Sequence, residues 1–265
     1  MPWRNAHPTP PVQHAPQAFL SPASKRAENQ AATGTQLQAT LGMVSVRARE
    51  QMVQRLEQAN IAAPAVLAAM RHVPRHAFVD TALASRAYDD ATLPIGFKQT
   101  ISAPAVVARM VSLACEAVFT NGAWLEIGTG CGYQAAVMAH CTAQVCSVER
   151  VQGLAELAKA QLAAQGLGHI ALLHGDGTVP WHTQFVSSHG KHGYVRFDAI
   201  VVAAAGLGTP QTWLDQLNIG GRLLTPLQDA LGVQRLHCIT RLSETQFEHR
   251  SLEPVQFVPL LGGVI

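Results

Sequence analysis

The sequence is short of charge and of long apolar runs. Charged residues make up only 14% of its 265 residues, and the formal net charge of +2 is too small to indicate a nucleic-acid partner. No apolar run reaches the length that a bilayer span requires, and no signal-peptide core is present. Because 48% of the residues are hydrophobic, we expect a globular chain with neither nucleic acid nor a membrane as partner.

Cysteine is scarce as well. The five cysteines are odd in number, scattered along the chain and form no CxxC pair. This pattern fits neither a disulfide framework nor a zinc site. It predicts reduced thiols, a cytoplasmic location and no metal centre.

The first 42 residues differ from the remainder. They contain six of the 15 prolines, few large apolar side chains and the whole of the net charge. Such a segment cannot bury enough apolar surface to offset the entropy lost on ordering. We therefore predict a disordered tail rich in Pro, Gln and Ala over residues 1–42, and a single domain over 43–265. A targeting peptide is the weaker alternative, because the tail is poor in arginine and has no clear amphipathic pattern.

Beyond the tail, the hydrophobic pattern predicts an α/β domain. Apolar spacing indicates helices over 43–56 and 63–71, and strands and helices alternate further along the chain. Such alternation implies a mostly parallel sheet with helices on both faces. Two final strands, 235–241 and 255–260, have no clear helix between them, and an antiparallel hairpin at the sheet edge is expected. The other predicted strands are 123–127, 145–148, 170–173, 197–203 and 222–226, and the other predicted helices are 134–139, 154–165 and 210–217.

A glycine loop follows the strand predicted over 123–127. Gly128, Gly130 and Gly132 stand at every second position before a helix, where backbone amides can approach a ligand closely. Tyr133 stands where the dinucleotide fingerprint GxGxxG has its third glycine. The spacing therefore differs from that of a dinucleotide site.

Acidic residues end three successive predicted strands. Glu126 stands directly before the glycine loop, where a carboxylate would repel a pyrophosphate but suit a cation. Glu149, 21 residues after Gly128, ends the next strand, where an acid can accept hydrogen bonds from ribose hydroxyls. Asp176 ends the third strand at the same sheet edge. S-adenosylmethionine carries an ammonium group and no phosphate, so this pattern favours it as the ligand. The alternative, which the pattern disfavours, is that the glycines form a tight turn and the acids are solvated, with no ligand bound.

Ser102 precedes another predicted helix, which has Pro104 in its first turn. The Ser102 hydroxyl and the free amides of that turn could hold a carboxylate. The simpler interpretation is a helix N-cap, which the local sequence alone favours because serine is a preferred capping residue. The two roles can coexist.

Ten stretches of the chain, in order, match one enzyme family. The most specific is Gln-Thr-Ile-Ser-Ala-Pro at 99–104, whereas the glycine loop identifies only a methyltransferase. The others are 73–75, 77–80, 93–96, 125–136, 147–150, 175–177, 197–200, 220–223 and 257–260. Together they resemble the protein-L-isoaspartate (D-aspartate) O-methyltransferases, which begin the repair of damaged aspartyl and asparaginyl sites. The resemblance covers nearly everything from Met43 to the C-terminus.

The resemblance implies a Rossmann-like, seven-stranded methyltransferase fold with extra N-terminal helices and an altered arrangement of the C-terminal strands. It also implies that isoaspartyl-containing proteins and peptides are the substrates, methylated on the α-carboxylate, and we expect a monomer. Ser102 is implied to be the active-site serine, with Gln99 in the same loop. The residues implied to bind S-adenosyl-L-methionine are Thr100, Ile101, Glu126, Gly128, Gly130, Gly132, Glu149, Asp176 and Gly177.

Two other functions stay open. A carboxylate with a pKa of roughly 4 is already ionised at neutral pH, so this reaction needs positioning and not a general base. An S-adenosylmethionine-dependent enzyme with a different acceptor would share the cofactor site, and a non-catalytic relative would bind the cofactor, or a partner through its tail. The retained loop at 99–104 argues against the non-catalytic relative, and Tyr133 and Glu126 disfavour a dehydrogenase.

Three features depart from the family pattern. Lys98 stands where many bacterial members have glycine, and Cys131 replaces a common serine in the glycine loop. Residues 182–196 lengthen one connection and contain three histidines, but their spacing does not indicate a metal site, and a solvated loop is expected. None of these differences touches a predicted site residue, so activity is expected.

Overall fold

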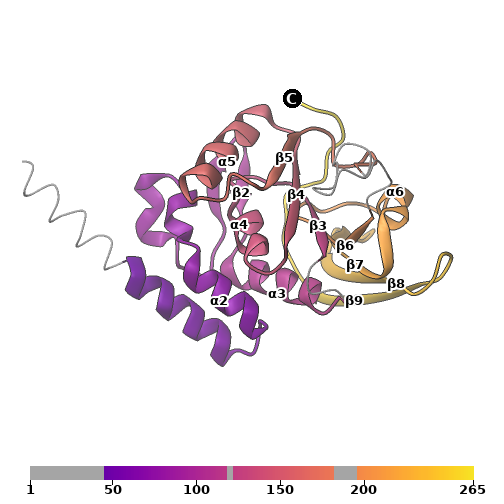
Figure 1. The fold of residues 1–265 in the computed structure, drawn as a ribbon, viewed down its shortest axis with the longest axis horizontal. Helices are drawn as coiled ribbons and strands as arrows, with labels where there is room; N and C mark the ends of the chain where they lie inside the picture. The colour runs from indigo at the N-terminus through magenta and orange to yellow at the C-terminus, as the bar shows by residue number, and fades with distance from the viewer. Residues whose placement is uncertain (1–44, 118–121, 182–195) are drawn as a thin grey trace, which may run out of the picture. The chain divides into compact units, whose positions relative to one another are not determined.

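The computed structural model of the protein describes residues 45–117, 122–181 and 196–265. The predicted tail over 1–42 and residues 182–195 of the predicted loop lie outside the described residues. The described residues belong to one α/β unit built around a seven-stranded sheet (Figure 1).

The sheet is parallel over most of its width and antiparallel at one edge. Its strands are β3 (Ala123–Ile127), β4 (Gln144–Glu149), β5 (Ala171–His174), β6 (Phe197–Val202), β7 (Leu217–Gln228), β8 (Gln234–Arg241) and β9 (Phe247–Pro254). They lie in the order β5-β4-β3-β6-β7-β8-β9, and neighbours are parallel from β5 to β7. β8 pairs antiparallel with β7, and β9 pairs antiparallel with β8. The last three strands therefore lie side by side in chain order.

The helices and a separate hairpin surround this sheet. A helix over 45–58 comes first in the described residues. The other helical elements are α2 (Pro64–His72), η1 (Arg75–Phe78), η2 (Thr81–Arg86), α3 (Pro104–Cys115), α4 (Tyr133–Ala139), α5 (Gln152–Ala164) and α6 (Gln211–Asp215). A two-stranded hairpin, β1 (Leu93–Gly96) and β2 (Gln99–Ile101), precedes α3.

β3 and β6 lie in the interior of the sheet because their residues are mostly hydrophobic. All residues of β6 are buried, and its successive side chains point to opposite faces. On one face, Trp124 and Val201 belong to the core that α2, α3 and α4 cover. On the other face, Leu125 and Ile200 pack in a second cluster with Trp213 of α6. Helices therefore cover both faces, as the sequence predicts.

One element prediction near the C-terminus is wrong, and another has different bounds. Residues 255–260 are not a strand: the edge strand is β9, which is mostly polar and exposed and so lacks the apolar pattern of a buried strand. The helix predicted over 210–217 is shorter, because Pro210 is the N-cap of α6 and Leu217 already pairs with β6 as the first residue of β7. An antiparallel hairpin does lie at the sheet edge, but its second strand is β9 and not the predicted strand 255–260.

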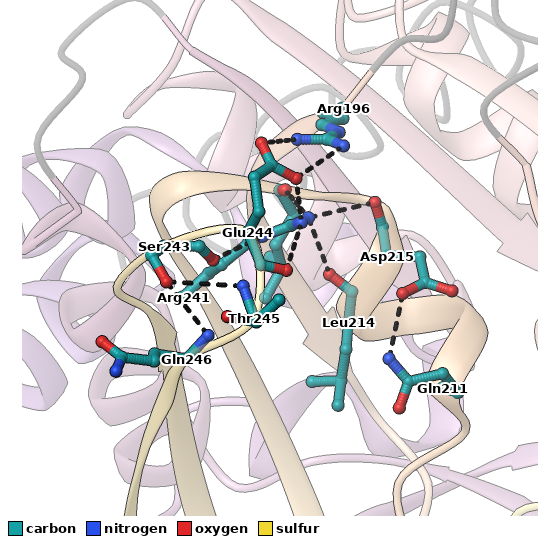
Figure 2. Close-up of polar contacts among 10 residues, drawn as sticks. Arg196, Gln211, Leu214, Asp215, Arg241, Ser243, Glu244, Thr245 and Gln246 are labelled. Carbon is teal, nitrogen blue, oxygen red and sulfur yellow. Dashed lines mark hydrogen bonds and ion pairs between the residues drawn. The ribbon is translucent and has the colours of Figure 1, made fainter.

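A buried arginine joins this edge hairpin to the parallel part of the sheet (Figure 2). Arg241, the last residue of β8, is 3% exposed. Its Nη1 donates to the Leu217 carbonyl at 2.9 Å, and its Nη2 donates to the Glu244 carboxylate at 2.7 Å. Glu244 also accepts hydrogen bonds from Arg196, which precedes β6. The turn between β8 and β9 is thereby fixed to the ends of α6 and β6.

Candidate active site

The glycine loop begins where β3 ends, at the carboxyl edge of the parallel strands. Gly128, Gly130 and Gly132 have φ angles of +91°, +56° and +89°, which glycine adopts without steric strain. The loop crosses towards β4, where the Gly128 amide donates to the Val148 carbonyl at 2.9 Å. It ends at Gly132, the N-cap of α4. The predicted unit of strand, glycine loop and helix is confirmed.

A cleft opens at this sheet edge. It encloses about 890 Å³, a volume that includes open solvent at its mouth. The glycine loop, the β1–β2 hairpin with the loop after it, and residues 258–261 line it. Seven of the ten predicted site residues are among the lining residues: Thr100, Ile101, Ser102, Gly128, Gly130, Glu149 and Gly177.

Glu149 is fixed at the cleft by two backbone amides. It ends β4 and is 5% exposed. One carboxylate oxygen accepts a hydrogen bond from the Gly130 amide at 2.8 Å, and the other accepts one from the Val151 amide at 2.9 Å. Each oxygen keeps a further lone pair. Because Glu149 lines the cleft, these lone pairs can accept hydrogen bonds from the hydroxyl groups of a ligand.

Glu126 lies behind the glycine loop and is not among the residues that line the cleft. Its buried carboxyl group accepts hydrogen bonds from Gln134 Nε2 at 3.1 Å and from Ser147 Oγ at 2.5 Å. Burial raises the pKa of Glu126 to about 8, although these two donors favour the ionised form. At neutral pH the group therefore carries a proton for most of the time, instead of the negative charge that the sequence suggests. Its contacts join β3 to β4 and α4.

The remaining predicted residues take different positions. Asp176 and Gly132 are not among the lining residues. One Asp176 oxygen accepts hydrogen bonds from the Thr178 amide at 2.8 Å and the Thr178 hydroxyl at 2.7 Å, which shapes the loop after β5. Gly177 does line the cleft, and a Cβ atom there would overlap Cγ2 of Ile127. A larger residue therefore does not fit at Gly177 unless the Ile127 side chain or β3 shifts.

The β1–β2 hairpin brings the Ser102 loop to the cleft. Its turn has three successive positive φ angles, +90° at Gly96, +51° at Phe97 and +59° at Lys98. The Phe97 ring lies against Gly153 near the start of α5, where it occupies the place that a Cβ atom would need. The hairpin is thus in contact with the helix that follows Glu149.

Ser102 is not the N-cap of α3, so the capping interpretation is wrong. The N-cap is Ala103, and Asp90 supplies the capping contact by accepting a hydrogen bond from the Ala105 amide at 3.0 Å. The cap comes from a residue distant in sequence, which local spacing does not reveal. Among the described residues, none hydrogen-bonds to the Ser102 hydroxyl, whereas the Ser102 carbonyl accepts from Arg75 Nη2 at 2.7 Å. The hydroxyl is therefore available to a ligand.

The C-terminal segment is residues 258–265, and its first part, 258–261, forms a side of the cleft that the sequence does not predict. The Ile265 amide donates to the Arg150 carbonyl at 2.9 Å, and Arg150 Nε donates to the Gly263 carbonyl at 3.1 Å. The Gly263 amide donates to the Asp176 carboxylate at 2.5 Å. The segment therefore ties together the loops that follow β4 and β5. Its apolar start is the signal in the sequence, but that pattern predicts a strand.

The described parts of the chain contain no group of three or more His, Cys, Asp or Glu side chains that could hold a metal ion. Within the same residues, no helix is long and apolar enough to cross a bilayer.

Comparison with known proteins gives the family. A model of the protein-L-isoaspartate(D-aspartate) O-methyltransferase family matches residues 47–264. The chain is 51% identical over 227 residues to protein-L-isoaspartate O-methyltransferase of Bordetella avium, which covers 85% of this chain and 81% of that protein. It is 46% identical over 266 residues to the protein of that name from Burkholderia pseudomallei, which covers 98% of this chain and 79% of the relative.

Solved structures agree at the level of the fold. A Plasmodium falciparum protein-L-isoaspartate O-methyltransferase in complex with S-adenosyl-L-homocysteine has a TM-score of 0.66 and 22% identity, and the match covers 80% of this chain and 98% of that one. The predicted seven-stranded methyltransferase fold is confirmed. Since the family model spans most of the sequence and the bacterial relatives match it closely, the chain belongs to the protein-L-isoaspartate (D-aspartate) O-methyltransferase family.

Proposed function

We propose that the chain transfers a methyl group from S-adenosyl-L-methionine to the α-carboxylate of L-isoaspartyl and D-aspartyl residues in damaged proteins and peptides, which initiates their repair. One observation carries the proposal: the glycine loop and the Ser102 loop line the same cleft. A methyltransferase must hold its donor and its acceptor side by side, and these two loops give it a place for each. Membership in the family supports the same activity.

The donor end of the cleft, formed by the glycine loop and Glu149, fits S-adenosylmethionine. Glu149 presents fixed carboxylate oxygens to ribose hydroxyls, and Gly177, which has no side chain, lets the backbone after β5 pack against Ile127 at the cleft. When bound, the cofactor supplies an electrophilic methyl group on a positively charged sulfur. We assign direct cofactor contacts to Thr100, Ile101, Gly128, Gly130, Glu149 and Gly177, and an indirect role through loop shape to Glu126, Gly132 and Asp176.

The acceptor end is the Ser102 loop. The amides at the start of α3 offer less than the sequence suggests, because Pro104 has no N–H and the Ala105 amide already donates to Asp90. The Ser102 hydroxyl is therefore the group that we assign to orienting the acceptor carboxylate. Gln99 also lines the cleft and is the next polar side chain within reach of a peptide substrate.

The reaction requires that the methyl donor and the acceptor are oriented and that water is excluded from the cleft. Bound S-adenosylmethionine would supply the methyl group to an oxygen of the acceptor carboxylate, and the electron pair of the broken carbon–sulfur bond would stay on sulfur. A carboxylate with a pKa of roughly 4 is already ionised, so no proton moves and no general base is needed. Ile95, Val107 and Ile127 give part of the cleft an apolar lining, which excludes water and strengthens the attraction between the two opposite charges.

We also propose that the enzyme is a cytoplasmic monomer. The five cysteines are free thiols, which suits a reducing compartment. The described residues of one chain supply both the donor loop and the acceptor loop. Light scattering coupled to size exclusion should give a mass near 28.3 kDa, and a mass near twice that value would contradict the monomer.

The assay that tests the activity uses labelled S-adenosylmethionine and two peptides that differ only in an aspartyl or isoaspartyl linkage. We expect a methyl ester on the isoaspartyl peptide alone. Labelling of both peptides would indicate a different acceptor. Labelling of neither would indicate a non-catalytic relative. Either of these results would contradict the proposed function.

A further inference from the structure

Arg75 is a fully buried arginine behind the acceptor end of the cleft. It is the first residue of η1, and its side chain is 0% exposed. Nε donates to the Ala87 carbonyl at 2.8 Å, and Nη2 donates to the Ser102 carbonyl at 2.7 Å. One guanidinium group therefore holds the segment after η2 and the Ser102 loop in fixed positions.

The charge of Arg75 has no carboxylate partner within the described residues. None of the ion pairs there includes it, and its Nη1 has no hydrogen-bond partner. Asp90 is the acid whose charge acts on it, but that carboxylate accepts from the Ala105 amide instead. Arginine keeps its proton even when buried, and a buried charge without a partner is costly.

The side chains that connect Arg75 to the cleft are neutral. Cζ of Arg75 lies 4.7 Å from the centre of the Tyr133 ring, and Tyr133 and Cys131 both line the cleft. Burial raises the pKa of Tyr133 to about 12 and that of Cys131 to about 11, so neither supplies a negative charge at pH 7. The Tyr133 hydroxyl is also buried without a partner among the described residues. On this side, therefore, no ionised side chain of the described residues stands between the positive charge of Arg75 and the cleft.

The cleft consequently has two electrostatically different ends. The carboxyl group of Glu149 lies at the donor end, and the cation of Arg75 lies behind Ser102 at the acceptor end. This polarity matches a cationic methyl donor and an anionic acceptor. We propose that Arg75 is a positioning residue that makes the acceptor site selective for a carboxylate, because it fixes the Ser102 loop and places an unpaired positive charge behind it. The inference rests on the proposed function, since it concerns the acceptor of that reaction.

The test compares two peptides that differ in one group. In one, the isoaspartyl residue has its α-carboxylate; in the other, a neutral α-carboxamide of nearly the same shape takes its place. Calorimetry on the enzyme loaded with S-adenosyl-L-homocysteine gives both affinities without turnover. We expect the wild type to bind the carboxylate peptide roughly tenfold more tightly, because charge interactions are strong in a desolvated site. Equal binding of the two peptides would overturn the inference.

Substitutions then locate the source of the preference. Arg75→Gln removes the charge but keeps an amide donor, so the ratio of the two affinities should fall at least roughly fivefold. Arg75→Lys keeps the charge and should keep the ratio, while kcat falls because lysine cannot hold both carbonyls. Lys98→Met is the matched control: Lys98 is the cation in the hairpin turn, and its loss should leave the ratio unchanged.

A merely structural role for Arg75 would weaken the binding of both peptides equally and leave their ratio intact, and that result in Arg75→Gln would overturn the inference. If circular dichroism shows that Arg75→Gln does not fold, Arg75→Lys decides: a ratio that falls together with kcat contradicts the role of the charge. The proposed function is judged separately, by whether the wild type methylates the carboxylate peptide.

Discussion

Replacing Glu126 with glutamine is expected to remove a pH dependence from the stability of the fold. The pKa of Glu126 is about 8 in the folded protein because of burial, against 4.5 for the free side chain. Between these values the folded state holds a proton that the unfolded state has lost, so stability decreases as the pH rises. Each pH unit is worth about 1.4 kcal/mol, and the range from pH 5 to pH 8 therefore amounts to about 4 kcal/mol.

Urea denaturation at pH 5, 6, 7 and 8 measures this effect directly. When the unfolding free energy of Glu126→Gln is subtracted from that of the wild type, the contributions of all other titrating groups cancel. We expect the wild type to lose about 4 kcal/mol relative to the variant over this range. Glu156→Gln, at an exposed position of α5, is the control and should give a constant difference. A constant difference for Glu126→Gln, or one that rises with pH, would refute the argument from burial.

Three further substitutions test the cleft. Ser102→Ala should lower kcat roughly a hundredfold while the calorimetric Kd of S-adenosylmethionine stays within about twofold; an equal loss of cofactor affinity would mean a structural role. Glu149→Ala should raise that Kd roughly tenfold, and an unchanged value would contradict hydrogen bonding to the ribose. Gly177→Ala places a methyl group against the Ile127 side chain and should lower Tm by several degrees. Gly208→Ala, where a Cβ atom meets open space, is the control and should leave Tm unchanged. Equal Tm values for the two variants would contradict the steric argument.

The parallel part of the sheet could be predicted because each strand is an apolar run between loops. The strand Phe197–Val202 is buried on both faces, and its sequence shows this directly. The edge strand Phe247–Pro254 could not be predicted in the same way. It has a partner on one side only and exposes most of its side chains, so its polar residues do not differ in pattern from those of a loop.

The candidate active site, like the sheet, could be predicted from the sequence only in part. The glycine loop and Ser102 could be placed at one cleft from their sequence pattern and from the family resemblance. The protonation of Glu126 could not, because it depends on how completely β3, β4 and α4 enclose the carboxyl group. Arg75 is a stronger case: the sequence places it in a stretch that matches the family, but only packing shows that it is buried without a carboxylate partner in the described residues.

The contacts of the C-terminal segment place a constraint on protein engineering. Ile265 and Gly263 bind the backbone and side chain of Arg150 at the rim of the cleft, close to α5 (Figure 1). Substitutions at residues 263–265 are expected to shift Arg150, which lines the cleft, although these three residues do not line it themselves. Engineering of this segment should therefore change cofactor affinity without altering a residue that contacts the cofactor.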